Sequence, residues 1–311
     1  MKSRGNRLGF GPRHDAKREQ LRGIAKETLE AIDCGHYVLN GTMHDLSAGL
    51  TLSQRNTQYY APDSLLSAWF STPAPGNPAS TEVALLEVST LEGGRLLATM
   101  LQANQASKIG ALNFASAVKP GGGFKSGAQA QEESIARSST LYATLMTPLA
   151  QTFYSVHNSD TKHGYYSHAM VYSPGVVVFR ADSGEWVEPM EIDVLTSAAV
   201  NAGQVRQTLT GHRDASGVEE RIGAVMKERM ARILFLFEKQ GVRNVVLGSF
   251  GTGVFRNNIN LVANIWADLL LEEGARFKTS FAHVMFAILG RPTFEEFERV
   301  FEERKPRVAN L

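Results

Sequence analysis

The sequence is poor in the residues that would mark several classes of protein. Of its 311 residues only Cys34 is a cysteine, so we expect no internal disulfide and no cysteine-based metal cluster. It carries 32 Lys and Arg against 31 Asp and Glu, a formal net charge of +1, so no overall field attracts it to nucleic acid. No apolar run resembles a signal peptide or reaches the length of a membrane span. We expect a soluble intracellular protein, cytoplasmic or, in a eukaryote, nuclear, with no membrane contact.

One local excess of charge lies at the N-terminus. It can be a contact for nucleic acid or another polyanion, but the solvated face of a helix explains it better. Seven basic residues form it: Lys2, Arg4, Arg7, Arg13, Lys17, Arg18 and Arg22.

Beyond the N-terminus, short apolar segments alternate with amphipathic ones. We expect a basic, flexible stretch over 1–14, an accessory segment over 15–80 that contributes a helix at 15–32 and strands or an extended lid, and a core over 81–305. In the core, strands at 83–88, 109–115, 176–179, 190–196, 242–247 and 281–289 alternate with helices at 91–105, 131–149, 218–240, 259–272 and 293–303. Strands separated by helices predict a layered α/β fold with a largely parallel sheet.

The most informative motif is Gly121-Gly122-Gly123, which lies between the strand at 109–115 and the helix that begins at Gln131. A glycine run can be a plain turn. Three consecutive glycines, however, are costly in chain entropy, and they let a backbone approach an anion closely. A helix N-terminus adds free N–H groups and a positive dipole end. The glycine run is therefore more consistent with binding a phosphate of a ligand than with a plain turn.

Two adjacent glutamates, Glu132 and Glu133, follow the glycine run. Acidic residues are common in a first helical turn because they complement the dipole, so the pair can be purely structural. Adjacent helical residues point about 100° apart, since a turn takes about 3.6 residues. The two carboxylates can therefore contact different parts of one ligand, and a desolvated one can act as a general acid, as glycoside hydrolysis requires.

A second glycine-rich loop, residues 248–253, joins the strand at 242–247 to the helix at 259–272. Ligands of such sheets bind at the carboxyl ends of the strands, where two loops can converge. Phe255 can pack on a ribose or base there, or simply in the core. Ser155, His157 and Asp160 lie close in sequence, but no nucleophile-elbow or metal-ligand spacing surrounds them. We expect neither serine chemistry nor a metal.

Several of these segments together resemble the microbial-type poly(ADP-ribose) glycohydrolases. The glycine run, seven residues and then Gln131-Glu132-Glu133 is similar to the signature loop of that family. Further similar segments follow in the same order over most of the chain, at 113–115, 127–133, 137–142, 172–174, 178–180, 195–199 and 251–257.

The resemblance implies a fold, a reaction and partners. The fold is a macrodomain-like three-layer α/β/α sandwich with a mixed sheet and an N-terminal accessory segment. The reaction is hydrolysis of ribose–ribose bonds in poly(ADP-ribose), chiefly from chain ends, with ADP-ribose as product, no cofactor and no metal. The partners are poly(ADP-ribose) or ADP-ribosylated proteins, in the reversal of ADP-ribosylation and the DNA damage response, for a protein expected to be a monomer.

The resemblance also implies roles for individual residues. Glu133 would be the catalytic acid and base, and Glu132 would grip a ribose hydroxyl. The three glycines would wrap the diphosphate and the distal ribose, and Phe255 would pack on that ribose. The remaining expected ADP-ribose ligands are Asn113, Gln131, Ser249, Gly251, Thr252, Gly253 and Val254.

The sequence departs from relatives at two places. They often have Trp and Cys where Phe250 and Thr252 stand, and a proline near Val200, so packing on the adenine side can differ. Two other functions stay open. One is a non-catalytic ADP-ribose reader, against which the glutamate pair argues. The other is a hydrolase of mono-ADP-ribosyl groups or O-acetyl-ADP-ribose.

Overall fold

The computed structural model describes residues 12–75, 81–101, 107–159 and 163–304. Its helices are α1 (Pro12–Cys34), α2 (Ser47–Asn56), η1 (Leu65–Trp69), α3 (Thr90–Met100), η2 (Phe124–Ser126), α4 (Gln131–Ser138), α5 (Leu141–Leu145), α6 (Pro148–Asn158), α7 (Ala202–Arg206), α8 (Leu209–Arg213), α9 (Ala215–Lys239), α10 (Ile259–Leu270) and α11 (Arg291–Arg304). Its strands are β1 (His36–Leu39), β2 (Thr42–Asp45), β3 (Gln58–Tyr60), β4 (Glu82–Leu86), β5 (Ile109–Phe114), β6 (Met170–Arg180), β7 (Trp186–Ser197), β8 (Asn244–Leu247) and β9 (His283–Ala287).

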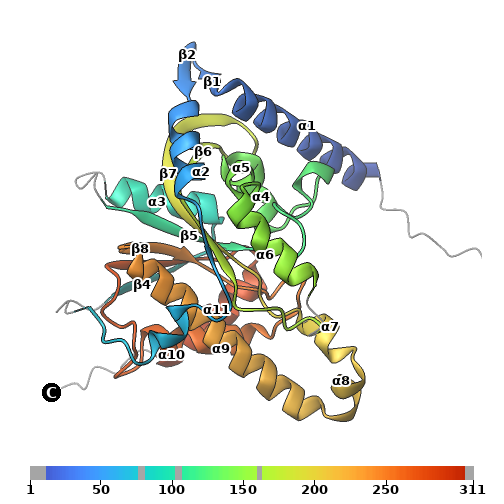
Figure 1. Cartoon of the computed structure of the whole chain (residues 1–311), viewed down its shortest axis with the longest axis vertical. Coiled ribbons are helices and arrows are strands. Elements are labelled where there is room, and N and C mark those ends of the chain that lie inside the picture. Colours follow the sequence, from blue (N-terminus) through green and yellow to red (C-terminus); the bar gives the residue numbers. More distant parts are fainter. Residues whose placement is uncertain (1–11, 76–80, 102–106, 160–162, 305–311) are drawn as a thin grey trace, which may run out of the picture.

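A seven-stranded mixed sheet forms the middle layer, in the order β3-β6-β7-β5-β8-β9-β4. The strands from β7 to β4 pair in parallel, whereas β6 runs antiparallel to both of its neighbours. Helices α3 to α6 lie on one side of the sheet and α9 to α11 on the other (Figure 1). The expected three-layer α/β/α sandwich with a mixed sheet is therefore confirmed.

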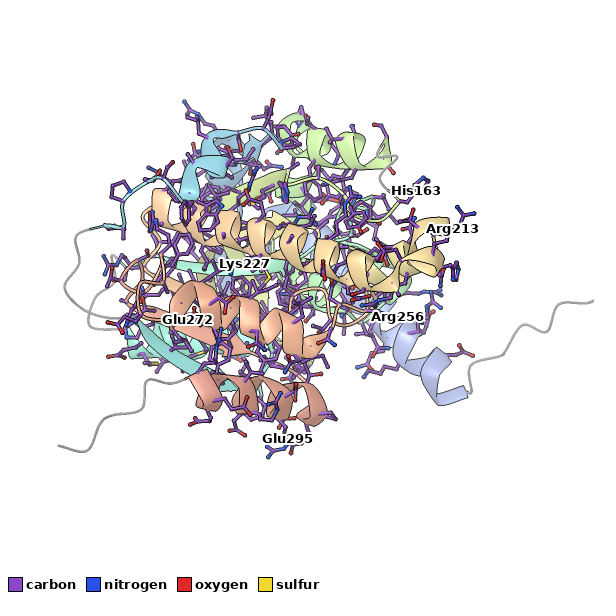
Figure 2. All side chains as sticks on the ribbon, turned by 90° about the horizontal axis from the view of Figure 1, so that it is seen from below. His163, Arg213, Lys227, Arg256, Glu272 and Glu295 are labelled. Atoms are coloured by element: carbon purple, nitrogen blue, oxygen red, sulfur yellow. The ribbon has the colours of Figure 1, made fainter. Side chains whose placement is uncertain are left out.

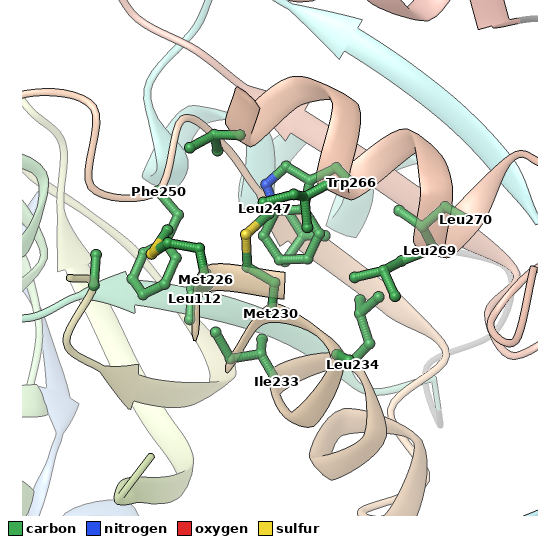
Figure 3. Packing of buried hydrophobic residues seen from close by; sticks show 14 of the residues in the cluster. Leu112, Met226, Met230, Ile233, Leu234, Leu247, Phe250, Trp266, Leu269 and Leu270 are labelled. Atoms are coloured by element: carbon green, nitrogen blue, oxygen red, sulfur yellow. The ribbon is translucent and has the colours of Figure 1, made fainter. Parts of the chain in front are cut away.

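Each face of the sheet has its own core, because successive side chains of a strand point to opposite faces. On β5, Leu112 joins the core beneath α9 to α11, whereas its neighbour Ala111 joins the core beneath α3, α5 and α6. The first core is the larger and centres on fully buried Trp266 (Figure 3). Figure 2 shows Lys227, Glu272 and Glu295 on the outer surface of the same layer.

The predicted helix at 131–149 is wrong, because three shorter helices occupy this stretch and continue beyond it. Ser139 has an extended backbone (φ −150°, ψ 175°) and forms a β-bridge with Val178 of β6, which ends α4. Thr147 then caps a new helix by accepting the N–H of Ala150, with Pro148 at its first position. Proline suits that position since its missing N–H would be unsatisfied there anyway.

The segment 15–80 packs on the rest of the chain at several points. Its strand β3 pairs with β6 at the edge of the central sheet, and α2, a helix where only strands or a lid were expected, packs beside β6. Tyr37 of β1 stacks on Phe179 and Trp186 of the β6–β7 pair. The proposed boundary at residue 81 stays a prediction.

Helix α1 lies against the segment that carries the glycine motif (Figure 1). Ala25 of α1 is buried against Phe124 of η2 and Ala136 of α4. The helix ends at Cys34, whose thiol is exposed. No helix among the described residues is long and apolar enough to cross a membrane.

Candidate active site

The two glycine-rich loops leave neighbouring strands of the sheet at the same edge. Strands β5 and β8 are paired in parallel, so their carboxyl ends lie side by side, which is where ligands of such sheets bind. The second loop contacts the end of β5, because the rings of Phe114 and Phe250 meet edge to face at 5.7 Å. The structure thus brings together the two loops that the sequence predicts to converge.

The first loop is shaped by two left-handed residues, Gly121 (φ +65°) and Gly122 (φ +57°). A side chain at Gly122 would also lack room, because a Cβ there would lie 2.3 Å from Oε1 of Glu133 and 3.0 Å from Oε2 of Glu132. Left-handed backbone is costly for residues with a Cβ. Glycine therefore lets the loop lie directly on the two carboxylates.

Gln131 joins helix α4 to strand β5. Its amide oxygen accepts the N–H of Phe114 at 2.9 Å, and its amide nitrogen donates to the carbonyl of Leu112 at 2.7 Å and to the hydroxyl of Thr90 at 3.0 Å. These bonds fix the first turn of α4 against the strand end. The structure thus gives Gln131 a positioning role, and its expected contact with a ligand stays a prediction.

Glu132 is almost completely buried, with 3% of its surface exposed. Its Oε2 accepts the N–H of Ser116 at 2.7 Å. Burial raises the pKa of Glu132 to about 8, and the charge of Glu133 pushes in the same direction, whereas the hydrogen bond from Ser116 opposes the shift. A large share of Glu132 therefore keeps its proton at neutral pH and can donate a hydrogen bond.

Glu133 is held at one oxygen and open at the other. Its Oε1 accepts the N–H of Gly123 at 2.8 Å. Its Oε2, Oε1 of Glu132 and Oδ1 of Asn113 are all buried and have no hydrogen-bond partner within the described part of the chain. Buried polar atoms are rarely left without a partner. Three such oxygens, one near the end of β5 and two on the first turn of α4, indicate a site whose partners come from a ligand.

The structure adds residues to the site that the sequence analysis did not name. Thr196, at the end of β7, accepts a hydrogen bond at 3.2 Å from the side-chain nitrogen of Asn113, which leaves the Oδ1 of Asn113 free. Arg137 donates to the carbonyl of Ala128 at 2.5 Å and lies close enough to Glu133 for their charges to interact. The sequence held two signals for Thr196, its position at the end of a predicted strand and its place in the segment 195–199 that resembles the family, but neither gave it a role.

The second loop is fastened at its base and exposed at its tip. Asn257 donates to the carbonyls of Gly251 at 2.9 Å and Val200 at 2.7 Å, and Thr252 donates to Ser249 through both its N–H and its hydroxyl. A Cβ at Gly253 would meet nothing within 4 Å.

The tip carries an apolar side chain, Val254, which is 81% exposed. Phe255 is half-buried and lies 5.9 Å from the ring of Tyr166. It packs against the edge of the larger core, and its expected contact with a ribose stays a prediction.

No group of three or more His, Cys, Asp or Glu side chains in the described ranges is arranged to hold a metal ion. His157 instead shares a hydrogen bond of 2.8 Å with the hydroxyl of Ser167 in the interior.

Comparisons with known proteins agree on one family. The family described as microbial-type PARG, catalytic domain, where PARG is poly(ADP-ribose) glycohydrolase, matches residues 25–181. A search of curated proteins found no match.

Solved structures of bacterial enzymes are similar over most of the chain. The poly(ADP-ribose) glycohydrolase of Thermomonospora curvata is 37% identical, with a TM-score of 0.81, over 92% of this chain and 100% of that one. The same enzyme bound to the inhibitor ADP-HPD is 36% identical, with a TM-score of 0.78, over 91% of this chain and 99% of that one. The enzyme of Deinococcus radiodurans in complex with ADP-ribose is 32% identical, with a TM-score of 0.71, over 82% of this chain and 98% of that one. By sequence, fold and the geometry of its glycine loops and glutamates, the chain belongs to the microbial-type poly(ADP-ribose) glycohydrolases.

Proposed function

We propose that the chain hydrolyses the ribose–ribose O-glycosidic bonds of poly(ADP-ribose), mainly from chain ends, and releases ADP-ribose. The observation that carries the proposal is the carboxylate of Glu133, fixed at Oε1 by the N–H of Gly123 while its buried Oε2 has no partner among the described residues. A general acid has to be positioned in this way, with one oxygen directed at the bond to be broken.

Proton transfer by Glu133 accounts for both halves of the reaction. Protonated Glu133 gives its proton to the oxygen of the leaving ribose while the bond from that oxygen to the anomeric carbon breaks. The distal ribose passes through an oxocarbenium-like state. Ionised Glu133 then takes a proton from the attacking water, and the hydroxide adds to the anomeric carbon, which restores protonated Glu133.

The surrounding residues orient the substrate and stabilise charge. We assign the distal ribose hydroxyls to Glu132 and Asn113, because each has a free buried oxygen there. The diphosphate lies between the two glycine-rich loops. The N–H groups of Gly122 and Gly123 already donate to Lys119 and Glu133, so the backbone donors to the diphosphate come from the tip of the second loop and need no reorganisation during the reaction. Phe255 packs on the distal ribose.

The substitution Glu133→Gln tests the assignment. It keeps the shape and the hydrogen bond from Gly123 but removes proton transfer. We expect release of ADP-ribose from poly(ADP-ribose), measured by chromatography, to fall at least about a thousandfold, while ADP-ribose still binds in calorimetry. Glu295→Gln, on the outer surface of α11 (Figure 2), is the matched control. Cleavage at the wild-type rate by Glu133→Gln would contradict the role of Glu133.

The same assay decides between substrates. Wild-type protein is incubated with poly(ADP-ribose), with a mono-ADP-ribosylated protein and with O-acetyl-ADP-ribose. Release from the polymer alone supports the proposal. Release only from the other substrates, or binding without release, identifies the hydrolase of single ADP-ribosyl groups or the reader. Products sized over time separate cleavage at chain ends from internal cleavage.

Further parts of the proposal rest on the resemblance. They are independence from metals, tested by activity in excess chelator, a monomeric state, tested by light scattering, and a role in the DNA damage response. The cytoplasmic location rests instead on composition. Each stays a prediction.

A further inference from the structure

Two arginines of α1 converge on the loop that follows the three glycines. Nε of Arg18 donates to the carbonyl of Ser126 at 2.7 Å, and Nε of Arg22, one turn later, points at the same oxygen at 3.4 Å. Lys125, the preceding loop residue, is exposed and donates to the hydroxyl of Tyr142 at 2.7 Å. We call Arg18, Arg22 and Lys125 the cationic strip.

The cationic strip is poorly neutralised. Neither Arg18 nor Lys125 has a carboxylate within ion-pair distance in the described part of the chain, and Arg22 pairs only with Glu19, whose side chain is 73% exposed. Three positive charges against one negative leave an excess of two. By contrast, the arginines of α11 are matched, as in the pairs of Arg299 with Glu296 and Glu303. Charge that the protein leaves uncompensated is available to a ligand.

The strip lies next to the proposed point of bond cleavage. Gly123, whose N–H holds Glu133, is only two residues before Lys125, so their Cα atoms are at most about 7.6 Å apart. The leaving ribose must reach Glu133 with its 2′ oxygen, and in the polymer that ribose carries the next diphosphate on its 5′ carbon, on the far side of the sugar ring. The first negative charges of the leaving chain therefore emerge near the outer end of the glycine loop.

We propose that the cationic strip binds the diphosphate of the polymer unit on the leaving side of the cleaved bond. This inference rests on the proposed function, since it concerns the next unit of the same substrate. Arg22 and Lys125 bind the phosphate oxygens. Arg18 joins them while its Nε keeps α1 attached to the loop, so the helix and the loop form one binding surface. The protein then distinguishes a polymer from a single ADP-ribosyl group by charge that lies beyond the two glycine-rich loops.

The double variant Arg22→Gln/Lys125→Gln tests the strip, because it spares Arg18 and its bond to Ser126. We expect kcat/KM on polymer to fall about tenfold. Its dependence on salt should also weaken, by about 0.7 in log–log slope for each lost phosphate contact. Cleavage of an ADP-ribosyl phenol glycoside, whose leaving group has no phosphate, should not change. Lys239→Gln, an exposed lysine at the end of α9, is the matched control.

Equal losses on both substrates, or an unchanged kcat/KM on polymer, would overturn the proposal. The proposal would also be overturned if the double variant lost as much affinity for single-stranded DNA as for polymer with the same number of phosphates. If the wild-type protein cleaves neither substrate, the proposed function fails separately. The strip is then judged by anisotropy with labelled polymer, which the double variant must bind more weakly than Lys239→Gln does.

Discussion

Gly122 meets two separate demands, on its backbone and on the space beside it. Its φ is +57°, and a Cβ would lie 2.3 Å from Oε1 of Glu133. The first demand is conformational and affects stability, whereas the second is steric and displaces the carboxylate. The two can be separated, because Gly241 also has a positive φ (+71°) but open space where a Cβ would be.

Gly122→Ala and Gly241→Ala should therefore differ in activity more than in stability. Each should lower the free energy of unfolding by about 1–2 kcal/mol through left-handed strain, as measured by urea denaturation. Only Gly122→Ala should also lower kcat on polymer, by about a hundredfold, since it moves Glu133 by a fraction of an ångström or more. Similar kcat values for the two variants would show that the close approach to Glu133 has no part in catalysis.

Glu132 should make stability depend on pH. Its pKa in the folded protein, about 8, lies above its ordinary value of 4.5, so between these values the folded state binds more protons than the unfolded state. Its contribution is then fully present below pH 4.5 and is lost as pH rises to about 8. The free energy of unfolding should decrease over this window, by at most about 1.4 kcal/mol per pH unit from this group.

The variant Glu132→Gln should flatten this dependence, because glutamine does not titrate. The measurement is the midpoint of thermal unfolding from pH 5 to pH 8 for both proteins. Parallel curves would contradict the raised pKa. Glu30→Gln, an exposed change on α1, controls for the general effect of losing a charge.

At the scale of elements, the short helix α4 is held from three sides. Gln131 attaches its start to β5, and the extended Ser139 ends it against β6. The hydroxyl of Thr28 on α1 donates to the carbonyl of Arg137 at 2.6 Å in a buried bond. The helix that carries both glutamates thus depends on contacts from distant parts of the chain.

Thr28→Val tests the contact with α1. It keeps the shape of the side chain but leaves the carbonyl of Arg137 without its donor, so we expect a loss of about 1–3 kcal/mol in the free energy of unfolding and a lower kcat. Thr51→Val removes a comparable bond at 2.8 Å, from an exposed helical threonine to Ser47, and should cost less than about 0.5 kcal/mol. Calorimetry and polymer kinetics on both variants provide the comparison.

These elements also show what could be predicted from the sequence. The strands β5 and β8 and the loops after them were predictable, because apolar runs followed by glycines are local signals. The break at Ser139 was not, since it depends on a bridge to Val178 that lies 39 residues away. The hydrogen bonds of Thr196 with Asn113 and of Thr28 with Arg137 could not be predicted either. They depend on the order of the strands and on the position of α1, which are set by contacts between distant parts of the chain.

Over the whole molecule, the site lies where two cores meet. Strands β5, β7 and β8 contribute alternate residues to both cores, so the strand ends that carry Asn113, Thr196 and the second loop are fixed from both faces. The alternation of strands and helices predicts this layered arrangement. It does not predict the antiparallel β6, because the long connection before it contains no signal for its direction.

Cys34 has a practical consequence. It is the one cysteine of the sequence, and its thiol is exposed at the end of the helix that lies against the glycine loop. A maleimide dye or a nitroxide would therefore attach at one position without prior mutagenesis. The fluorescence of the dye, or the mobility of the nitroxide, would report in solution whether α1 shifts when the protein binds polymer.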